Sequence, residues 1–344
     1  MKNKKTISPV PFRTPPNLPL ERGGMGKRPK LIVILGPTAS GKTAMATRLA
    51  KKFNGEIINA DSRAIYREMK VATSRPGLKE GGVRHHLVGF REPDSDFGLA
   101  EYKKLAVDKI NNVLARGKQP FLVGGTWLYI RAVADNLEIP QVAPNKVFRK
   151  KLEKLSAKVL WARLQKADPE AAKKIHANDK RRVIRAMEVI HYSGRKISEQ
   201  QKAGEPLYQV LKIGIKRGLD EIEMRARTRI KKEMGEKLIR ETRKLLKKYL
   251  PAEFSGATKP KRSGGFSAVR EAGSPDLPAM TSLGYREIGE YLRGNLTKTE
   301  AFELLAKNTR RFARYQLNTF RQDKKIKWVK NLKGAERRIG KFLK

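Results

Sequence analysis

One stretch of eight residues has the types and spacing needed to hold phosphate groups. In the pattern G-x-x-x-x-G-K-[ST], consecutive backbone N–H groups and a helix N-terminus surround a diphosphate or triphosphate. The lysine, Lys42, adds a positive charge, and the hydroxyl of Thr43 can reach a Mg²⁺ ion on the phosphates. The pattern predicts an anion site without deciding which diphosphate binds. It is formed by Gly36, Pro37, Thr38, Ala39, Ser40, Gly41, Lys42 and Thr43.

A carboxylate follows the next apolar run, EIINAD, which ends at Asp61. Ligands of doubly wound sheets bind at the carboxyl ends of the strands, so Asp61 is expected beside the phosphate loop. There it could hold Mg²⁺, as in a kinase or ATPase, or accept a proton from an attacking nucleophile. A plain helix N-cap together with Ser62 is the third interpretation.

A third strand, PFLVGGT, ends in two glycines and a threonine at the position where an NTPase often has an acidic metal ligand. Gly124 and Gly125 indicate a close approach of the backbone to a substrate. Thr126 adds a hydroxyl at the same edge of the sheet.

The segments that carry these residues alternate between strand and helix. LIVIL precedes the phosphate loop, a helix then runs to Phe53, and a second helix spans 99–116 before PFLVGGT. This order predicts an α/β fold: a P-loop NTPase-like parallel sheet with flanking helices and a helical insertion domain. The catalytic core is expected over 30–138 and 205–325, with a strand over 210–216, helices over 221–249, 285–292 and 298–322, and a flexible loop over 251–278.

Residues 139–204 are expected to form the insertion, because the segment has helical periodicity, many Arg and Lys residues and almost no strand signal. Arg181 and Arg185 are four residues apart, as on a helix that faces phosphates, although a solvated face is the simpler alternative. Arg310 and Arg314 repeat that spacing, and core packing is favoured for Phe312 beside them. Residues 1–29 are interpreted as a disordered basic arm and 326–344 as a basic tail.

The composition favours a polyanionic partner. There are 77 Lys and Arg against 34 Asp and Glu, a formal net charge of +43, which exceeds what solubility requires and indicates a nucleic acid. The chain has no cysteine, which excludes disulfides, thiolate zinc sites and cysteine nucleophiles and fits a cytoplasmic location. No apolar run is long enough to span a membrane, so no membrane partner is expected.

Several further motifs occur in a characteristic order between residues 30 and 322. After GPTASGKT come ADS with Tyr66, HHL, GGTWLY, HANDKRRVIRAMEVIHYSGRKISEQQ, SLGYREI and TRRFARYQ. In this order the chain resembles the tRNA dimethylallyltransferase, or isopentenyltransferase, family. It departs from the family pattern at Ala64, Ala72, Trp127, Tyr315 and Thr319.

The resemblance implies a reaction and assigns roles. The phosphate loop would hold dimethylallyl diphosphate, with Mg²⁺ as cofactor, and a monomer would act on the anticodon stem-loop of tRNA. Asp61 would take the proton from N6 of the adenosine 3′ of the anticodon, in tRNAs reading codons that begin with U. Thr38, Lys42 and Arg229 would stabilise the leaving group, with Arg225 as second candidate for the arginine. Contacts to tRNA are implied for Asp61, Ser62, Arg63, Ala64, Thr126, Arg149, Arg181, Arg182, Val183, Ile184 and Arg185.

Three other functions share part of these features. An adenylate dimethylallyltransferase that uses free AMP or ADP would have the same loop, Asp61 and Thr126, but would not need an Arg-rich insertion. A small P-loop kinase or ATPase is supported by GPTASGKT alone. A nucleic-acid-binding module without catalysis would leave the phosphate loop and Asp61 unexplained.

Overall fold

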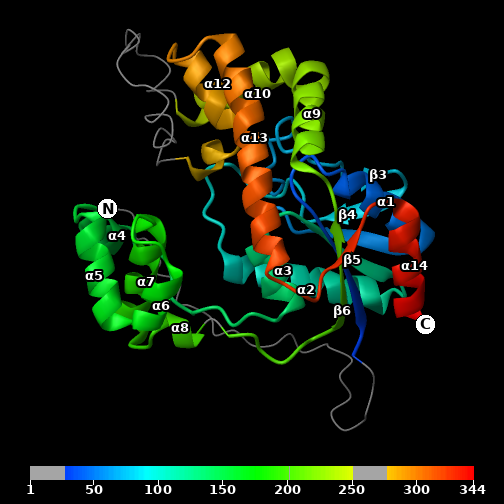
Figure 1. Cartoon of the computed structure of the whole chain (residues 1–344), viewed down its shortest axis with the longest axis horizontal. Helices are drawn as coiled ribbons and strands as arrows, with labels where there is room; N and C mark the ends of the chain where they lie inside the picture. Colours follow the sequence, from blue (N-terminus) through cyan, green and yellow to red (C-terminus); the bar gives the residue numbers. More distant parts are fainter. Residues whose placement is uncertain (1–27, 201, 251–276) are drawn as a thin grey trace, which may run out of the picture.

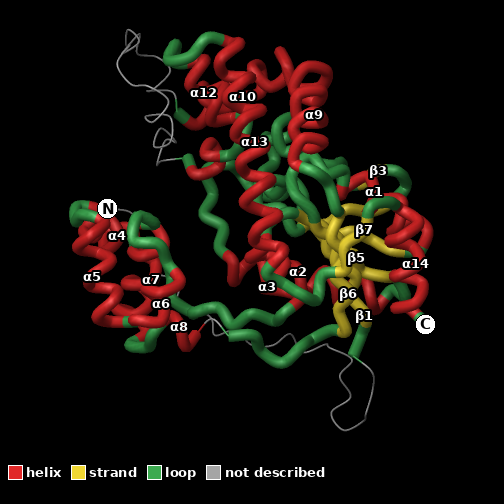
Figure 2. The backbone as a smooth tube through the Cα atoms, viewed as in Figure 1, coloured by secondary structure: helices red, strands yellow, loops and turns green. Residues whose placement is uncertain are grey.

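A seven-stranded sheet lies at the centre of the protein in a computed structural model, which describes residues 28–200, 202–250 and 277–344. The strand order is β3-β4-β2-β5-β1-β6-β7, and only the β3–β4 pair is antiparallel. The expected α/β class with a parallel sheet is confirmed, and Figure 2 shows the strands enclosed by helices. The strands are β1 (Lys30–Leu35), β2 (Gly55–Asn59), β3 (Lys79–Glu80), β4 (Val83–His86), β5 (Gln119–Gly124), β6 (Gln209–Ile215) and β7 (Lys327–Val329).

Helices cover both faces of the sheet, which explains why its strands read as continuous apolar runs. In β1, Leu31, Val33 and Leu35 point to one face and Ile32 and Ile34 to the other, and all are fully buried. The first face packs against α2 (Leu99–Ala115) and α3 (Trp127–Ala134), and the second against α1 (Lys42–Lys52) and α14 (Leu332–Leu343).

The expectation of a basic tail over 326–344 is corrected by the structure. Residues 327–329 form β7, which pairs in parallel with β6, and α14 follows with Ala335 and Ile339 buried against the sheet. The sequence looked like a tail because the basic residues of α14 all lie on its solvent face while its few apolar residues face inward. The expected arm over 1–29 and most of the loop over 251–278 lie outside the described residues.

The single helix expected over 221–249 is interrupted. The structure has α9 (Leu219–Arg229), a π turn (Ile230–Met234) and α10 (Gly235–Tyr249). Gly235 has a φ of 32°, a conformation that glycine reaches without steric cost, and it allows the chain to change direction there. After a 3₁₀ turn (Pro278–Thr281), α12 (Tyr285–Leu292) and the 24-residue α13 (Lys298–Arg321) pack with α10 around a second apolar core.

Between α3 and β6 the chain leaves the sheet and forms a separate helical bundle, drawn in green in Figure 1. Its leucine, alanine, valine and isoleucine side chains make a core of their own, so the helical nature expected for this region is observed. Side chains of Asn145, Ser156, Asp168 and Asp179 accept hydrogen bonds from the first backbone N–H groups of four of its helices. The helices are α4 (Lys146–Glu153), α5 (Ala157–Ala167), α6 (Pro169–Lys174), α7 (Lys180–Ser193) and α8 (Ile197–Gln200).

Among the described residues, no helix combines the length and apolar character needed to cross a lipid bilayer.

A fully buried carboxylate, Glu188, ties the bundle together. It accepts hydrogen bonds from the Arg149 guanidinium at 2.9 and 2.6 Å, from Arg185 at 2.6 Å and from the backbone N–H of Asn145 at 2.7 Å. Burial alone would raise the pKa of Glu188, but these bonds outweigh it and lower the pKa below its usual value. The bundle therefore depends on one ionised carboxylate held by two arginines.

Replacing Glu188 by Gln is expected to destabilise the protein by about 2–3 kcal/mol, because two guanidinium groups lose their counter-charge. The loss is smaller than for a fully buried pair, since the side chains of both arginines keep 32% of their area exposed. Denaturant unfolding of the variant, beside the exposed control Glu199→Gln, measures this difference.

The difference in unfolding free energy between the wild type and Glu188→Gln should become smaller at low pH. Since the folded-state pKa of Glu188 is lowered, its contribution is fully present above the unfolded carboxyl pKa of about 4.3 and is lost as the pH falls through the folded value. An equal stability difference at pH 7 and at pH 3 would contradict an ionised Glu188.

Candidate active site

The phosphate loop lies between β1 and α1, as the sequence pattern predicts. Ala39 and Gly41 adopt positive φ angles of 60° and 82°, which turn the backbone around a concave loop before α1 begins at Lys42. The hydroxyl oxygen of Ser40 is buried and has no hydrogen-bond partner among the described residues. A buried hydroxyl without a partner, in a loop that precedes a helix N-terminus, suits a loop that binds an anion.

Lys42 lies where three charged groups meet. Burial lowers the pKa of its ammonium group, the carboxylate of Asp61 raises it, and the guanidinium of Arg229 lowers it further. Two cations and one carboxylate from α1, the end of β2 and α9 therefore share one small region. A bound diphosphate would relieve the repulsion between Lys42 and Arg229, which makes this region electrostatically suited to a multiply charged anion.

Asp61 is fixed just beyond the end of β2 by a neighbour that the sequence analysis did not single out. The side-chain amide of Asn59 donates to the carbonyls of Asp61 and Leu87, both at 3.0 Å, and its oxygen accepts from the Asp61 N–H at 3.1 Å. The Asp61 carboxylate itself accepts the N–H of Arg63 at 2.9 Å. This bond occupies one carboxylate oxygen of Asp61, Oδ1.

The ends of β2 and β5 touch. A Cβ on Gly124 would lie 2.1 Å from the carbonyl oxygen of Ala60, so only glycine fits there. The hydroxyl of Thr126 accepts the N–H of Ser62 at 3.0 Å and donates to its hydroxyl at 3.2 Å. Gly124 thus allows close approach of backbone to backbone, where a substrate had been expected, and this approach brings Thr126 beside the segment that follows Asp61.

Gln316, from the C-terminal third of α13, connects the phosphate loop to the β5 loop. Its side-chain oxygen accepts the N–H of Thr38 at 2.8 Å, and its amide nitrogen donates to the carbonyl of Gly125 at 2.9 Å. The side chain is only 5% exposed. The final glutamine of TRRFARYQ was the available signal, but its partners lie 278 and 191 residues away in the chain and could not be assigned from spacing.

Two arginines of α9 approach the loop from different directions. Arg229 is largely buried and donates to the carbonyls of Val71 and Ala72 at 3.1 and 2.7 Å, and burial lowers its pKa. Arg225 donates to the carbonyl of Ala39 at 3.0 Å, within the phosphate loop itself. The structure therefore places both candidates at the site, with Arg229 on the side of Lys42.

The residues for which contacts to tRNA are implied differ in how far their side chains are exposed to solvent. Arg181 and Arg182 are exposed on α7, whereas Arg149 and Arg185 bind Glu188 and keep only part of their side chains in solvent. Val183 and Ile184 are 0% and 4% exposed in the bundle core, and Ala64 is 4% exposed, so these three side chains face other protein groups. Near the phosphate loop, Arg63 donates to the hydroxyl of Thr281 at 3.1 Å.

The core packing favoured for Phe312 is not observed. Phe312 and Tyr315 are 42% and 55% exposed on α13, with ring centroids 6.5 Å apart and an angle of 18° between the rings. The guanidinium of Arg182 lies 3.3 Å from the hydroxyl of Tyr315, across the gap between the bundle and α13. Phe312 lies one helical turn before Gln316, Tyr315 directly precedes it, and Arg182 reaches Tyr315 from the bundle.

The residues around the loop are compatible with Mg²⁺. The Thr43 hydroxyl makes no hydrogen bond to a described residue, and Asp61 supplies a carboxylate nearby. Protein sites for Mg²⁺ often combine one or two such oxygens with substrate phosphates and water. Within the described residues there is no cluster of three or more His, Asp or Glu side chains that could hold a metal ion.

Comparisons with known proteins agree on one family. A family model described as IPP transferase matches residues 64–323. The tRNA dimethylallyltransferase of Halothermothrix orenii is 39% identical over 320 residues, which cover 90% of each chain. That of Carboxydothermus hydrogenoformans is 39% identical and covers 90% of this chain and 94% of the relative.

Solved structures give the same result. The tRNA isopentenylpyrophosphate transferase of Bacillus halodurans is 32% identical, with a TM-score of 0.61 over 91% of this chain and 95% of the other. A eukaryotic dimethylallyltransferase described as acting on tRNA is 25% identical, with a TM-score of 0.67 over 84% of this chain and 69% of the other.

Replacing Gln316 by Met should weaken binding of inorganic diphosphate about tenfold. The variant keeps the side-chain volume but leaves the Thr38 N–H and the Gly125 carbonyl without partners, so the loop loses its tie to the β5 loop. Titration calorimetry with diphosphate measures the change. The control Gln322→Met alters an exposed residue at the end of α13 and should bind normally; equal affinities for both variants would show that the tie does not shape the site.

Proposed function

The chain belongs to the IPP transferase family, and we propose that it transfers a dimethylallyl group from dimethylallyl diphosphate to N6 of the adenosine 3′ of the anticodon in tRNAs that read codons beginning with U. As a family member it is a transferase that modifies tRNA. The observation that carries the finer proposal is the meeting of Lys42, Asp61 and Arg229 at one edge of the sheet, beside the phosphate loop. This site combines a loop suited to an anion with the carboxylate of Asp61.

We assign binding of the donor, dimethylallyl diphosphate, to the phosphate loop. Its backbone N–H groups, with Lys42 and Arg229, match the charge that accumulates on a departing diphosphate. A kinase of this fold would often have an acidic metal ligand after β5, but Gly124 and Gly125 occupy that place and contact Ala60 and Gln316. The loop therefore favours a diphosphate leaving group over transfer of a phosphoryl group.

These groups account for each bond that forms or breaks in the transfer and for the proton that is released. The exocyclic N6 of adenosine attacks the allylic C1 of the donor, a C–N bond forms, and the C–O bond to diphosphate breaks. Asp61 takes the proton that N6 loses, and Lys42, Arg229 and the side chain of Thr38 hold the diphosphate as it leaves. Mg²⁺ at the Thr43 hydroxyl would neutralise further charge on the diphosphate.

The acceptor base must leave its stack to reach Asp61, as for other enzymes that act on a base. Arg181 and Arg182 of α7 and the exposed rings of Phe312 and Tyr315 lie on the approach to the site. Arginines hold phosphates and aromatic rings stack on unpaired bases, so this approach suits a single-stranded loop such as the anticodon loop. We place the reaction in the cytoplasm, where tRNA is found, with the protein acting as a monomer.

The direct test is transfer of radiolabelled dimethylallyl from its diphosphate to bulk tRNA, to an anticodon stem-loop and to free AMP, with ATP hydrolysis measured in parallel. Label in tRNA and in the stem-loop, but not in AMP, is the expected result. Label in AMP alone would indicate an adenylate dimethylallyltransferase. ATP hydrolysis without label transfer would indicate a P-loop ATPase.

Replacing Asp61 by Asn should lower kcat by about 10²–10⁴-fold, because the amide cannot take the N6 proton. The substitution keeps an oxygen for the N–H of Arg63, so the local turn and the Kd for tRNA should change little. Single-turnover transfer and tRNA binding measure the two effects. Asp94→Asn, at an exposed carboxylate, is the matched control; a kcat for Asp61→Asn equal to that of this control would remove Asp61 as the base.

A further inference from the structure

Helix α10 has two faces of opposite character. Its inner face is buried in the core shared with α12 and α13, through Leu238, Ile239, Thr242, Leu245 and Leu246. Its outer face is exposed and basic, and five of its cations line a hollow there: Arg240, Arg243, Lys244, Lys247 and Lys248. These five residues are called the α10 basic face.

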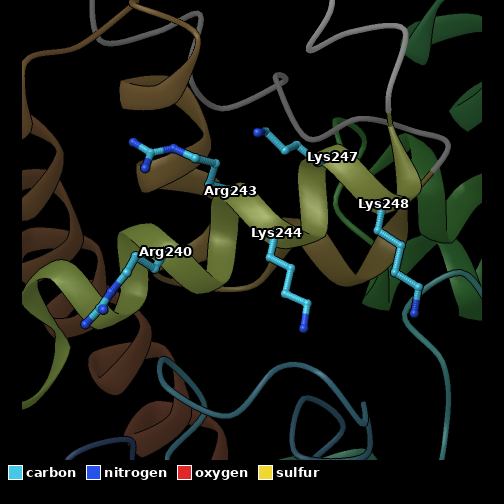
Figure 3. A pocket seen from close by; sticks show the side chains of 5 residues that line it. All are labelled: Arg240, Arg243, Lys244, Lys247 and Lys248. Atoms are coloured by element: carbon cyan, nitrogen blue, oxygen red, sulfur yellow. The ribbon is translucent and has the colours of Figure 1, made fainter.

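The five cations form two rows. Figure 3 shows Arg243 and Lys247 extending to one side of the helix axis and Lys244 and Lys248 to the other. Residues four apart are separated by about 6 Å along a helix, so each row is a regular line of positive charge. Between the rows lies a shallow hollow of about 450 Å³, lined only by these side chains. Its open shape suits an extended anion better than a small enclosed one.

The α10 basic face has few carboxylates to balance it. Glu236 pairs with Lys298, and Glu241 turns inward to accept the N–H groups of Lys70 and Val71. Lys248 pairs with Glu68. In the part of the chain that the structure describes, the side chains of Arg240, Arg243 and Lys244 make no hydrogen bond or ion pair.

The spacing of the cations on the α10 basic face lowers the stability of the helix. Like charges four residues apart repel each other, whereas a merely solvated helix would be stabilised by placing Glu opposite Lys at that spacing. Arg240 and Lys244, Lys244 and Lys248, and Arg243 and Lys247 are three such like-charged pairs on one helix. A polyanion bound along the face would convert this repulsion into attraction.

The α10 basic face lies close to the catalytic edge. The inner face of α10 packs against Ile65, Tyr66 and Met69, which follow Asp61 in the chain, and Glu241 holds the backbone at 70 and 71. The outer face is thus about one helix diameter, roughly 10 Å, from the segment that carries the proposed base. An RNA with one nucleotide in the active site is wide enough to reach it.

We propose that the α10 basic face binds backbone phosphates of the substrate RNA, in the base-paired stem next to the nucleotide that reacts. This inference rests on the proposed function, since it takes tRNA as the acceptor. The cations contact phosphates without reading bases, so they strengthen binding of every substrate tRNA equally and make it salt-dependent.

The test is a triple variant, Arg240→Gln, Arg243→Gln and Lys244→Gln, assayed as the full chain. KM for tRNA should rise about tenfold, while kcat at saturating tRNA and KM for dimethylallyl diphosphate stay at the wild-type values. In a direct tRNA-binding titration at several salt concentrations, the slope of log Kd against log salt should become shallower by about 2 to 3.

Two controls isolate the effect. The variant Arg337→Gln, Arg338→Gln and Lys341→Gln removes the same residue types from the exposed face of α14 and should keep the wild-type KM and slope. Arg240→Lys with Arg243→Lys keeps the charge and should also keep the slope. Thermal melting checks that all variants are folded.

The results separate the inference from the proposed function. A wild-type KM and salt slope in the α10 variant, or an equal loss in the α14 variant, would overturn the role of the α10 basic face. If the wild-type chain transferred no label to tRNA, the proposed function would fail. The salt slope of tRNA binding would still decide on α10 by itself.

Discussion

The contact between the ends of β2 and β5 is the constraint on which the site depends. Gly124 lies so close to the carbonyl of Ala60 that no side chain fits between them. Because these strands meet, Thr126 can hold the backbone after Asp61, and Gly125 can accept the hydrogen bond of Gln316. The carboxylate and the phosphate loop are therefore positioned by backbone packing in the sheet together with the side chains of Thr126 and Gln316.

Several carboxylates of this basic protein hold cations and backbone N–H groups in its interior. Glu188 holds two arginines of the helical bundle, Glu241 holds two backbone N–H groups and the hydroxyl of Tyr285, and Glu56 binds Arg116, Lys118 and His86. Each is buried or partly buried and satisfied by several donors. Since 34 acidic residues face 77 basic ones, acids committed to the interior leave the surface strongly positive.

The strands and the phosphate loop could be predicted because their signals are local: an apolar run, a glycine pattern and a helix start. Gln316, Asn59 and the placement of Arg229 could not, because their partners are distant in sequence and only the folded chain brings them together. Periodicity misjudged α14, whose few apolar residues are outnumbered by basic ones, and the break at Gly235, where one glycine changes the course of a helix. The departure at Trp127 is accommodated by packing against Phe320 and Lys212.

The pairing of β7 with β6 has a consequence for synthesis on the ribosome. β6 is made early in the second half of the chain, but its partner strand follows only after α9, α10, α12 and α13. Until residues 327–329 emerge, one edge of β6 carries unpaired N–H and C=O groups, and such edges invite pairing with other chains. A nascent or prematurely terminated chain is therefore exposed to aggregation at this edge, whereas the helical bundle, with its own core, can already be folded.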